Sequence, residues 1–382
     1  MVMMDSAVIA FVALCAAALY ILAGYPLLLA WRARRNAKPV KKDLKPQPVS
    51  IILAVRDGEK FLSPKLDSIL QSDYPRELME IIVVSNGSSD GTCSVAASYA
   101  SRGVRLVEVN RGAKPDAINE GVRQATANIL IFTDVRQILD PSSIGRLVAC
   151  FADPTVGVVS GFLVIHRAGI EEDNVSLYWR YERWVRSNLS SLDSMLGATG
   201  ALYAMRRELF LPMPSDTLLD DVFVPLAAFF NGYRLILEEN ARLFDYATTA
   251  NTEFRRKVRT LAGNYQIMQQ YPALLTTRNR LLFDFISYKF ARLLLPWIVL
   301  AILAVSFFLP RPWAEIFIAI QAVFYGLAAL DLVTGLRSPL KRLSSPARTV
   351  ASLLAASACA IVIFFVPANR LWKPTQTVVT GD

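Results

Sequence analysis

Three acidic residues of this chain stand where a strand is predicted to end or a helix to begin. Asp134 follows the apolar run 128–132 after one threonine. Asp220 and Asp221 open a predicted helix over residues 222–231. A carboxylate at a strand end is a candidate ligand for a hard cation, and a carboxylate in a cleft can act as a general base. The alternatives are a strand-end turn for Asp134 and a helix N-cap for the pair. Two adjacent acids also allow both roles, with Asp220 as the cap and Asp221 pointing into the cleft.

Two further segments are candidate phosphate contacts. Residues 86–92 (NGSSDGT) combine glycines with short polar side chains ahead of a predicted helix, so that backbone N–H groups can face an anion. Residues 254–259 (FRRKVR) carry Arg256 and Arg259, and arginine suits a phosphate clamp. An ordinary turn and a solvated or lipid-facing basic surface are the respective alternatives.

The composition excludes several kinds of chemistry. The chain has one histidine, His166, so a histidine metal site or a Ser–His dyad is nearly excluded. Its four cysteines show no C-x-x-C spacing, which predicts neither a zinc site nor a disulfide framework.

Alternating strand and helix patterns place these candidates in one α/β domain. Short apolar runs that predict strands alternate with segments of helical spacing: strands at 50–55, 80–85, 104–109 and 128–132, and helices at 61–71, 92–102 and 114–125. Continuous apolar strands separated by helices predict a mostly parallel sheet covered on both faces. Ligands of such sheets bind beyond the carboxyl ends of the strands, where the polar candidates stand.

Apolar segments at both ends of the chain predict a membrane protein. The 382 residues are 53% hydrophobic and 19% charged, and the apolar excess lies in the first ~30 and last ~90 residues. Candidate spans cover residues 8–31, 293–309, 313–333 and 349–367, each about long enough for a bilayer. A cleaved signal peptide is disfavoured because the basic cluster follows the first span. Residues 276–292 predict an interfacial amphipathic helix, with a helix of the soluble core as the alternative.

The charge distribution predicts the orientation of these spans. The net charge is +9, and basic residues gather after the first span and between the last two. This favours membrane lipids over nucleic acid as the partner and places the middle of the chain in the cytosol. The predicted domains are an N-terminal helix with its basic flank (1–36), a cytosolic domain (37–275), the interfacial helix (276–292) and a C-terminal membrane region (293–382).

In their order along the chain, these segments resemble glycosyltransferase family 2, most of all its membrane-bound branch, which includes cellulose, chitin, hyaluronan and poly-N-acetylglucosamine synthases. The segments that carry the resemblance are 50–59 (SIILAVRDGE), 82–92 (IVVSNGSSDGT), 111–121 (RGAKPDAINEG), 132–136 (FTDVR), 197–207 (GATGALYAMRR), 220–221 (DD) and 256–259 (RKVR). The resemblance implies a GT-A-type, Rossmann-like fold in the cytosol.

The resemblance also implies roles for single residues. Asp221 is expected to be the catalytic base, Gly200 and Asp220 to line the acceptor site, and Asp134 to hold Mg²⁺ or Mn²⁺. The expected contacts to the nucleotide-sugar donor are Ala54, Arg56, Glu59, Asn86, Lys114, Asp134, Arg256 and Arg259.

Three departures from the family pattern modify these expectations. Ser85 and Asn86 replace two acids, which weakens the expected contact to uracil. Arg136 replaces the second acid of the D-x-D motif, leaving one carboxylate for a metal. Thr260 replaces the tryptophan of the Q-x-x-R-W motif, which disfavours polymer synthesis.

The resulting expectation is an inverting glycosyltransferase that moves a sugar from a nucleotide-sugar, expected to be a UDP-sugar, to a saccharide or lipid-linked acceptor in surface or exopolysaccharide synthesis. It would lie in the bacterial inner membrane with its catalytic domain in the cytosol, as a homo-oligomer or with an export partner. The alternatives are a processive polysaccharide synthase, a non-catalytic membrane scaffold that retained the fold, and a transporter.

Overall fold

The computed structural model describes residues 2–166, 177–246, 250–333 and 340–371, and it divides the chain into two compact units. Residues 29–248 belong to an α/β unit, and residues 1–28 with 249–376 belong to a helical unit. The sequence prediction extended the cytosolic domain to residue 275, whereas this division assigns residues 249–275 to the helical unit.

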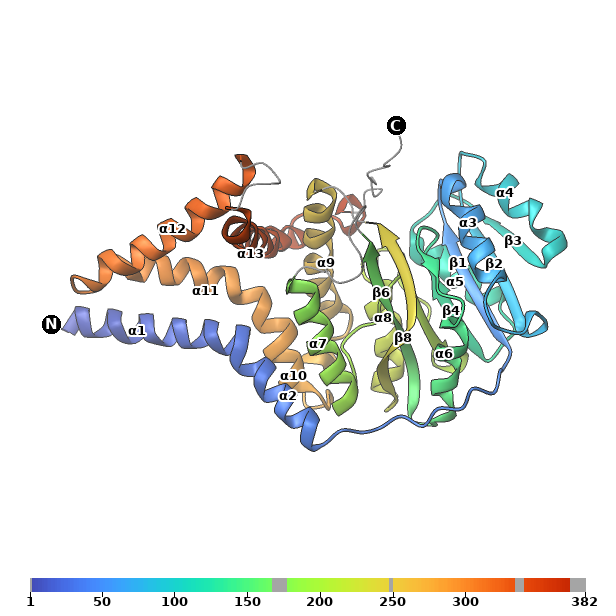
Figure 1. Ribbon diagram of the computed structural model, residues 1–382, viewed down its shortest axis with the longest axis horizontal. Helices are drawn as coiled ribbons and strands as arrows, with labels where there is room; N and C mark the ends of the chain where they lie inside the picture. Colours follow the sequence, from blue (N-terminus) through green and yellow to red (C-terminus); the bar gives the residue numbers. More distant parts are fainter. Residues whose placement is uncertain (1, 167–176, 247–249, 334–339, 372–382) are drawn as a thin grey trace. The chain divides into compact units, whose positions relative to one another are not determined.

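The α/β unit is built on one mixed sheet (Figure 1). Its strands are β1 (Val49–Val55), β2 (Met79–Asn86), β3 (Val104–Val109), β4 (Ile129–Thr133), β5 (Ile138–Leu139), β6 (Val156–His166), β7 (Leu202–Arg206) and β8 (Arg234–Tyr246). Their order is β3-β2-β1-β4-β7-β6-β8-β5. The first four are parallel, which confirms the predicted βα repeat, and β7 joins them antiparallel to β4.

Helices pack beside this sheet and connect its strands. They are α3 (Glu59–Leu70), α4 (Thr92–Ser98), α5 (Lys114–Gln124), α6 (Ser143–Ala149), α7 (Leu177–Leu192) and α8 (Asp220–Phe230). The aliphatic side chains of β1 and β2 are almost wholly buried, which supplies most of the driving force for this packing. Helix α5 approaches β1 closely at Gly121, where an added Cβ would lie 2.6 Å from the Ile52 side chain.

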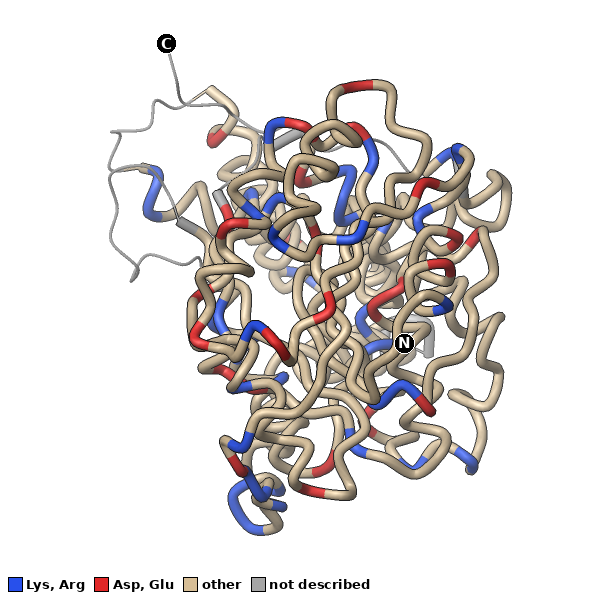
Figure 2. The backbone as a smooth tube through the Cα atoms, turned by 90° about the vertical axis from the view of Figure 1, so that its right-hand side faces the viewer, with Lys and Arg blue, Asp and Glu red and all other residues tan. Residues whose placement is uncertain are grey.

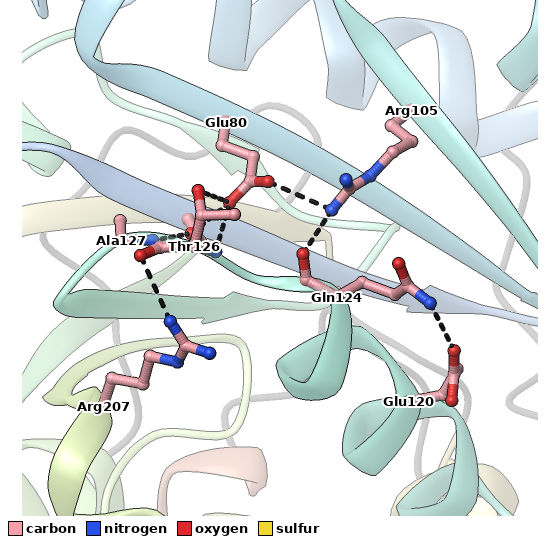
Figure 3. Close-up of polar contacts among 8 residues, drawn as sticks. Glu80, Arg105, Glu120, Gln124, Thr126, Ala127 and Arg207 are labelled. Atoms are coloured by element: carbon pink, nitrogen blue, oxygen red, sulfur yellow. Dashed lines mark hydrogen bonds and ion pairs between the residues drawn. The ribbon is translucent and has the colours of Figure 1, made fainter.

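A polar cluster ties the connection between α5 and β4 to the amino ends of the strands (Figure 3). The Glu80 carboxylate accepts hydrogen bonds from Ser50 at 2.5 Å, from the Thr126 backbone at 2.9 Å and from Arg105 at 3.0 Å. Burial opposes the charge of Glu80, but these donors together hold its pKa below the ordinary value. The cluster lies at the edge of the sheet opposite to the carboxyl ends of β1 and β4.

The basic linker before β1 is held against the α/β unit along its length. Lys38 forms an ion pair with Asp193 at 2.8 Å, and Lys42 forms one with the buried Glu238. The Arg234 guanidinium donates to the Lys38 carbonyl oxygen at 2.9 Å. Figure 2 shows acidic and basic positions interspersed along the backbone, as such pairing requires.

The helical unit contains helices of membrane-spanning length. Its elements are α1 (Val2–Leu19), a π-helical turn (Tyr20–Gly24), the start of α2 (Tyr25–Arg35), α9 (Ala250–Gln270), α10 (Leu282–Asp284), a second π-helical turn (Phe285–Phe290), α11 (Ala291–Ser306), α12 (Trp313–Val333) and α13 (Lys341–Cys359). Four helical segments are long and apolar enough to cross a membrane: Ser6–Arg35, Leu282–Ser306, Trp313–Val333 and Lys341–Phe364. Each of the four expected spans overlaps one of these segments. The expected interfacial helix over residues 276–292 is helical only from Leu282, and from there it continues without a break into the second segment.

Buried polar groups join the helices of this unit to each other. Tyr25 donates a hydrogen bond to the buried Asp284 at 3.1 Å, across 259 positions of the sequence. Asp331 on α12 is buried and pairs with Lys341 at 2.9 Å and Arg348 at 3.2 Å on α13. Each acid is thus compensated by a partner from another helix, as an ionisable group in an apolar surrounding requires.

Candidate active site at the carboxyl ends of the strands

Lys114 lies between two of the predicted acidic residues. Its Nζ atom is 2.9 Å from Asp134 Oδ1 and 3.1 Å from Asp220 Oδ2. Lys114 is the first residue of α5, Asp134 follows β4, and Asp220 begins α8, so three separate elements converge here. Asp134 is the most open of the three, with 36% of its side chain exposed against 14% for Asp220.

The two carboxylates fix the charge of Lys114. Burial would lower its pKa, but the negative charges of Asp134 and Asp220 and their hydrogen bonds raise it above the ordinary value. The ammonium group therefore stays protonated at neutral pH. The start of α5 that presents it is ordered by Asp116, whose carboxylate accepts a hydrogen bond from the Ala113 backbone at 3.0 Å.

Asp221 faces the segment that was predicted to line the acceptor site. Its Oδ2 atom accepts a hydrogen bond from the Gly200 backbone N–H at 3.1 Å, and its carbonyl oxygen accepts one from Ala198 at 2.7 Å. A Cβ atom at Gly200 would lie 3.0 Å from Asp221 Oδ2, so this close approach favours glycine. The N-cap of α8 is Leu219 without a side-chain capping bond, so neither aspartate is the helix cap.

The loops after β1, β2 and β3 are tied together around Arg56 and Asn86. The Arg56 guanidinium donates to the Asn86 carbonyl oxygen at 3.0 Å and also to the Gly112 carbonyl oxygen. The Asn86 side chain accepts from Gly112 N at 2.8 Å and donates to the Gly112 and Ala113 carbonyl oxygens. Its amide thus shapes the loop after β3. Ala54 lies near the end of β1 and is half-buried.

Glu59 belongs to the same group of loops. Its carboxylate accepts a hydrogen bond from Gly91 N at 3.0 Å, and its own N–H donates to Asp90 at 3.0 Å. The glycine-rich loop after β2 is therefore bound to the start of α3 by two hydrogen bonds, one to the side chain and one from the backbone of Glu59.

Arg136 points to a carboxylate on another strand. Its guanidinium lies 2.5 Å from Asp245 Oδ2 on β8, and Gln137 donates to the same oxygen at 2.9 Å. Asp245 is only 5% exposed, so the charge of Arg136 is neutralised by a buried carboxylate. This arrangement explains how an arginine is accommodated where an acid was expected.

A divalent cation fits this site only with ligands from outside the protein. In the part of the chain that the structure describes, no group of three or more His, Cys, Asp or Glu residues could hold a metal ion. Asp134 is exposed enough to give one carboxylate oxygen, and Mg²⁺ is commonly bound by one or two carboxylates together with substrate phosphates. The donor set therefore fits a cation that is shared with a diphosphate.

Arg256 and Arg259 belong to α9 of the helical unit, whereas the other candidates belong to the α/β unit. Arg256 lies 3.7 Å from Glu253 on the same helix. Their expected contact with the donor stays a prediction.

Two buried residues near the site were missed by the sequence reasoning. Lys65 of α3 is fully buried and donates to Thr133, next to Asp134. Tyr203 of β7 is also fully buried, and its hydroxyl has no hydrogen-bond partner among the described residues. Burial, followed by the charges of Asp220, Asp221 and Asp134, raises the pKa of Tyr203 well above its ordinary value. The signal for Lys65 was a lysine on the apolar face of a helix, three residues after Leu62 and four before Ile69.

Comparison with known proteins supports one family. Residues 50–211 match the model of glycosyl transferase family 2. A poly-β-1,6-N-acetyl-D-glucosamine synthase of Staphylococcus epidermidis is 31% identical over 117 residues, which are 30% of this chain and 28% of the synthase. A probable glycosyltransferase of Bacillus subtilis is 23% identical over 285 residues, 67% of this chain and 65% of that protein. The matches thus span less than two thirds of these curated relatives.

A solved structure has the same fold over most of the chain. The mannosyltransferase of Pyrobaculum calidifontis in complex with GDP-Man and Mn²⁺ superposes with a TM-score of 0.71 at 24% identity, covering 92% of this chain and 97% of that one. Its fold is that of the GT-A glycosyltransferases, which confirms the predicted fold class. Residues 50–211, which match the family model, hold Lys114, Asp134 and Gly200.

Proposed function

We propose that this protein is an inverting glycosyltransferase that moves a sugar from a nucleotide-sugar to a saccharide or lipid-linked acceptor at the cytoplasmic face of a membrane. The observation that carries the proposal is the placement of Asp221 against Gly200, beside the cluster of Lys114, Asp134 and Asp220. The transfer of a sugar to a hydroxyl group needs a base for the hydroxyl proton and a positive charge for the leaving diphosphate. Asp221 and Lys114 are the candidates for these two roles.

The donor diphosphate would bind at Lys114 and Asp134. Lys114 stays protonated and presents N–H donors that can turn to phosphate oxygens. Asp134 would hold Mg²⁺ or Mn²⁺ together with those oxygens, and the cation supplies charge neutralisation for the leaving diphosphate. Ala54, Arg56, Glu59 and Asn86 belong to the loops that would surround the nucleotide.

Asp221 would act as the general base. One carboxylate oxygen takes the proton of the acceptor hydroxyl while the hydroxyl oxygen attacks the anomeric carbon. The bond from that carbon to the diphosphate oxygen breaks, and the nucleoside diphosphate leaves with the electron pair. The Gly200 N–H would hold the other carboxylate oxygen by a hydrogen bond, so that the Asp221 side chain keeps the same orientation during the reaction.

The membrane helices favour an acceptor that is presented at the bilayer surface. Four segments can cross a membrane, and the basic linker after the first predicts that the α/β unit lies in the cytosol of a bacterial cell. A role in surface or exopolysaccharide synthesis agrees with the named activity of the Staphylococcus relative. Product length on a gel separates single transfer from processive synthesis.

Nucleotide release by the purified, detergent-solubilised protein tests this proposal. UDP-, GDP- and dTDP-sugars would be supplied with Mg²⁺ or Mn²⁺ and a lipid extract as acceptor, beside the variants Asp134→Ala and Asp221→Asn. We expect release from one donor, lowered in Asp221→Asn by about 10²–10⁴-fold with donor binding kept. Release from no donor, together with no nucleotide binding, would favour the scaffold alternative.

A further inference from the structure

Lys65 is a buried amine that forms no ion pair with a carboxylate among the described residues. Its side chain is 0% exposed on the inner face of α3. Burial lowers its pKa to about 7, although the nearby charge of Asp134 acts in the opposite direction. A buried unpaired charge is costly, whereas an apolar side chain would fill the same space without that cost. Packing therefore does not account for a lysine here.

Both hydrogen bonds of Lys65 go to the loop that carries Asp134. Its Nζ atom donates to Thr133 Oγ1 at 2.7 Å, just before Asp134, and to the Gln137 carbonyl oxygen at 2.8 Å, three residues after it. The ammonium group thus spans the turn from both ends. Gln137 also donates to Asp245, so the far end of the turn is fixed a second time.

Thr133 passes this constraint to the segment that orients Asp221. A hydroxyl has one hydrogen to give, and because Lys65 supplies the hydrogen to Thr133 Oγ1, the hydroxyl's own hydrogen goes to the Ala201 carbonyl oxygen at 2.8 Å. The same carbonyl accepts from Asp134 N at 3.3 Å. The preceding residue, Gly200, donates to Asp221 Oδ2 at 3.1 Å.

From these contacts we infer that Lys65 is a positioning residue that holds the Asp134 turn and the Gly200–Ala201 segment at a fixed separation, and thereby sets the distance between the cation-binding and proton-accepting carboxylates. This inference rests on the proposed function of Asp134 and Asp221. Lys65 touches neither substrate nor cation itself, because its side chain is fully buried.

Isosteric changes along this chain of contacts test the inference. Lys65→Met removes the ammonium and keeps the volume, and Thr133→Val removes the relaying hydroxyl. Thr133→Ser keeps that hydroxyl, and Ile69→Val trims a core residue of the same helix as a matched stability control. Three quantities are measured for each: kcat and donor KM by nucleotide release, Mn²⁺ binding in the presence of UDP or GDP by the electron spin resonance of free Mn²⁺, and the thermal unfolding midpoint.

We expect Lys65→Met and Thr133→Val to lose at least about tenfold in kcat, since small misplacements of catalytic groups cost up to about 10²-fold. Lys65→Met should also weaken Mn²⁺–nucleotide binding, which a general loss of stability would not do. Thr133→Ser and Ile69→Val should keep the wild-type kcat within about twofold.

The possible failures are distinguishable. Folded Lys65→Met or Thr133→Val with wild-type kcat and Mn²⁺ binding would overturn the inference while leaving the proposed function intact. A loss in Lys65→Met alone would overturn the relay through Thr133. If Lys65→Met does not fold, the comparison of kcat between Thr133→Val and Thr133→Ser still tests the relay through the Thr133 hydroxyl. A wild-type protein that releases no nucleotide from any donor would instead overturn the proposed function.

Discussion

The buried lysine predicts a specific pH dependence of stability. In the unfolded chain the pKa of Lys65 is near its ordinary value of 10.5, and in the folded protein burial lowers it to about 7. Below pH 7 both states carry the proton and the folded state bears the full cost of the buried charge. Between pH 7 and 10.5 only the unfolded state binds the proton, so stability rises with pH in this window.

The magnitude follows from the pKa difference. Each pH unit above pH 7 adds about 1.4 kcal/mol to the free energy of unfolding, and the whole window adds at most about 5 kcal/mol. From pH 7.0 to 8.5 the gain is about 2 kcal/mol, which corresponds to about 4–8 °C in unfolding midpoint for a domain of this size. Other groups titrate in the same window, so wild type must be compared with Lys65→Met, in which this gain is absent.

Thermal unfolding of both proteins in the same detergent and at the same heating rate, followed by tryptophan fluorescence, measures the effect. We expect the midpoint of wild type to rise relative to that of Lys65→Met as the pH increases from 7.0 to 8.5. At low pH the variant should be at least as stable as wild type, because it loses the buried charge and leaves only one carbonyl, that of Gln137, without its donor. A midpoint difference that does not change with pH would show that Lys65 keeps its ordinary pKa and would refute the reasoning.

Three further substitutions have expected outcomes. Tyr203→Phe should leave the unfolding midpoint unchanged or higher, because the hydroxyl has no partner among the described residues, whereas loss of a satisfied bond would cost about 1 kcal/mol; a clear drop in the thermal scan would reveal a partner. Arg136→Asp restores the second family acid but leaves Asp245 beside another carboxylate, so we expect a loss of about 3–5 kcal/mol in stability and no gain in Mn²⁺ binding; tighter binding would contradict this. Glu80→Ala should cost about 1–3 kcal/mol in unfolding experiments with kcat unchanged, since its bonds lie away from the site; a kcat loss in the folded variant would count against that separation.

The first half of the sheet could be predicted because each of β1 to β4 is a short apolar run and each of the first three is followed by a helix. Local pattern and fold agree there. The second half was not predicted in detail because β6 and β8 pair with interruptions in register, and β5 has only two residues. Such strands are defined by partners far along the chain and leave little local signal.

The site shows the same division between local and distant information. Parallel topology places Lys114, which follows β3, and Asp134, which follows β4, at the same edge of the sheet. Their contact at 2.9 Å also depends on the loop after β3, because β2 and β1 lie between these two strands. The direction of Arg136 depends on Asp245, which is 109 positions away, and no spacing rule connects them. The spacing of α3 places Lys65 on the apolar face of the helix, whereas its charge would predict a place at the surface. The contacts with Thr133 and Gln137 explain how the charged side chain is accommodated in the interior.

The adjacent acids Asp220 and Asp221 can do different work because they begin a helix. Successive helical side chains point about 100° apart, so the two carboxylates face different neighbours. Asp220 meets the ammonium of Lys114 at 3.1 Å, and Asp221 meets the Gly200 backbone at 3.1 Å. Lys114 neutralises the charge of Asp220, and in the proposed mechanism Asp221 takes the proton of the acceptor hydroxyl. Under that proposal Asp220 supports the donor side of the site through Lys114, and replacing Asp220 with an uncharged residue would leave Asp134 as the carboxylate paired with Lys114.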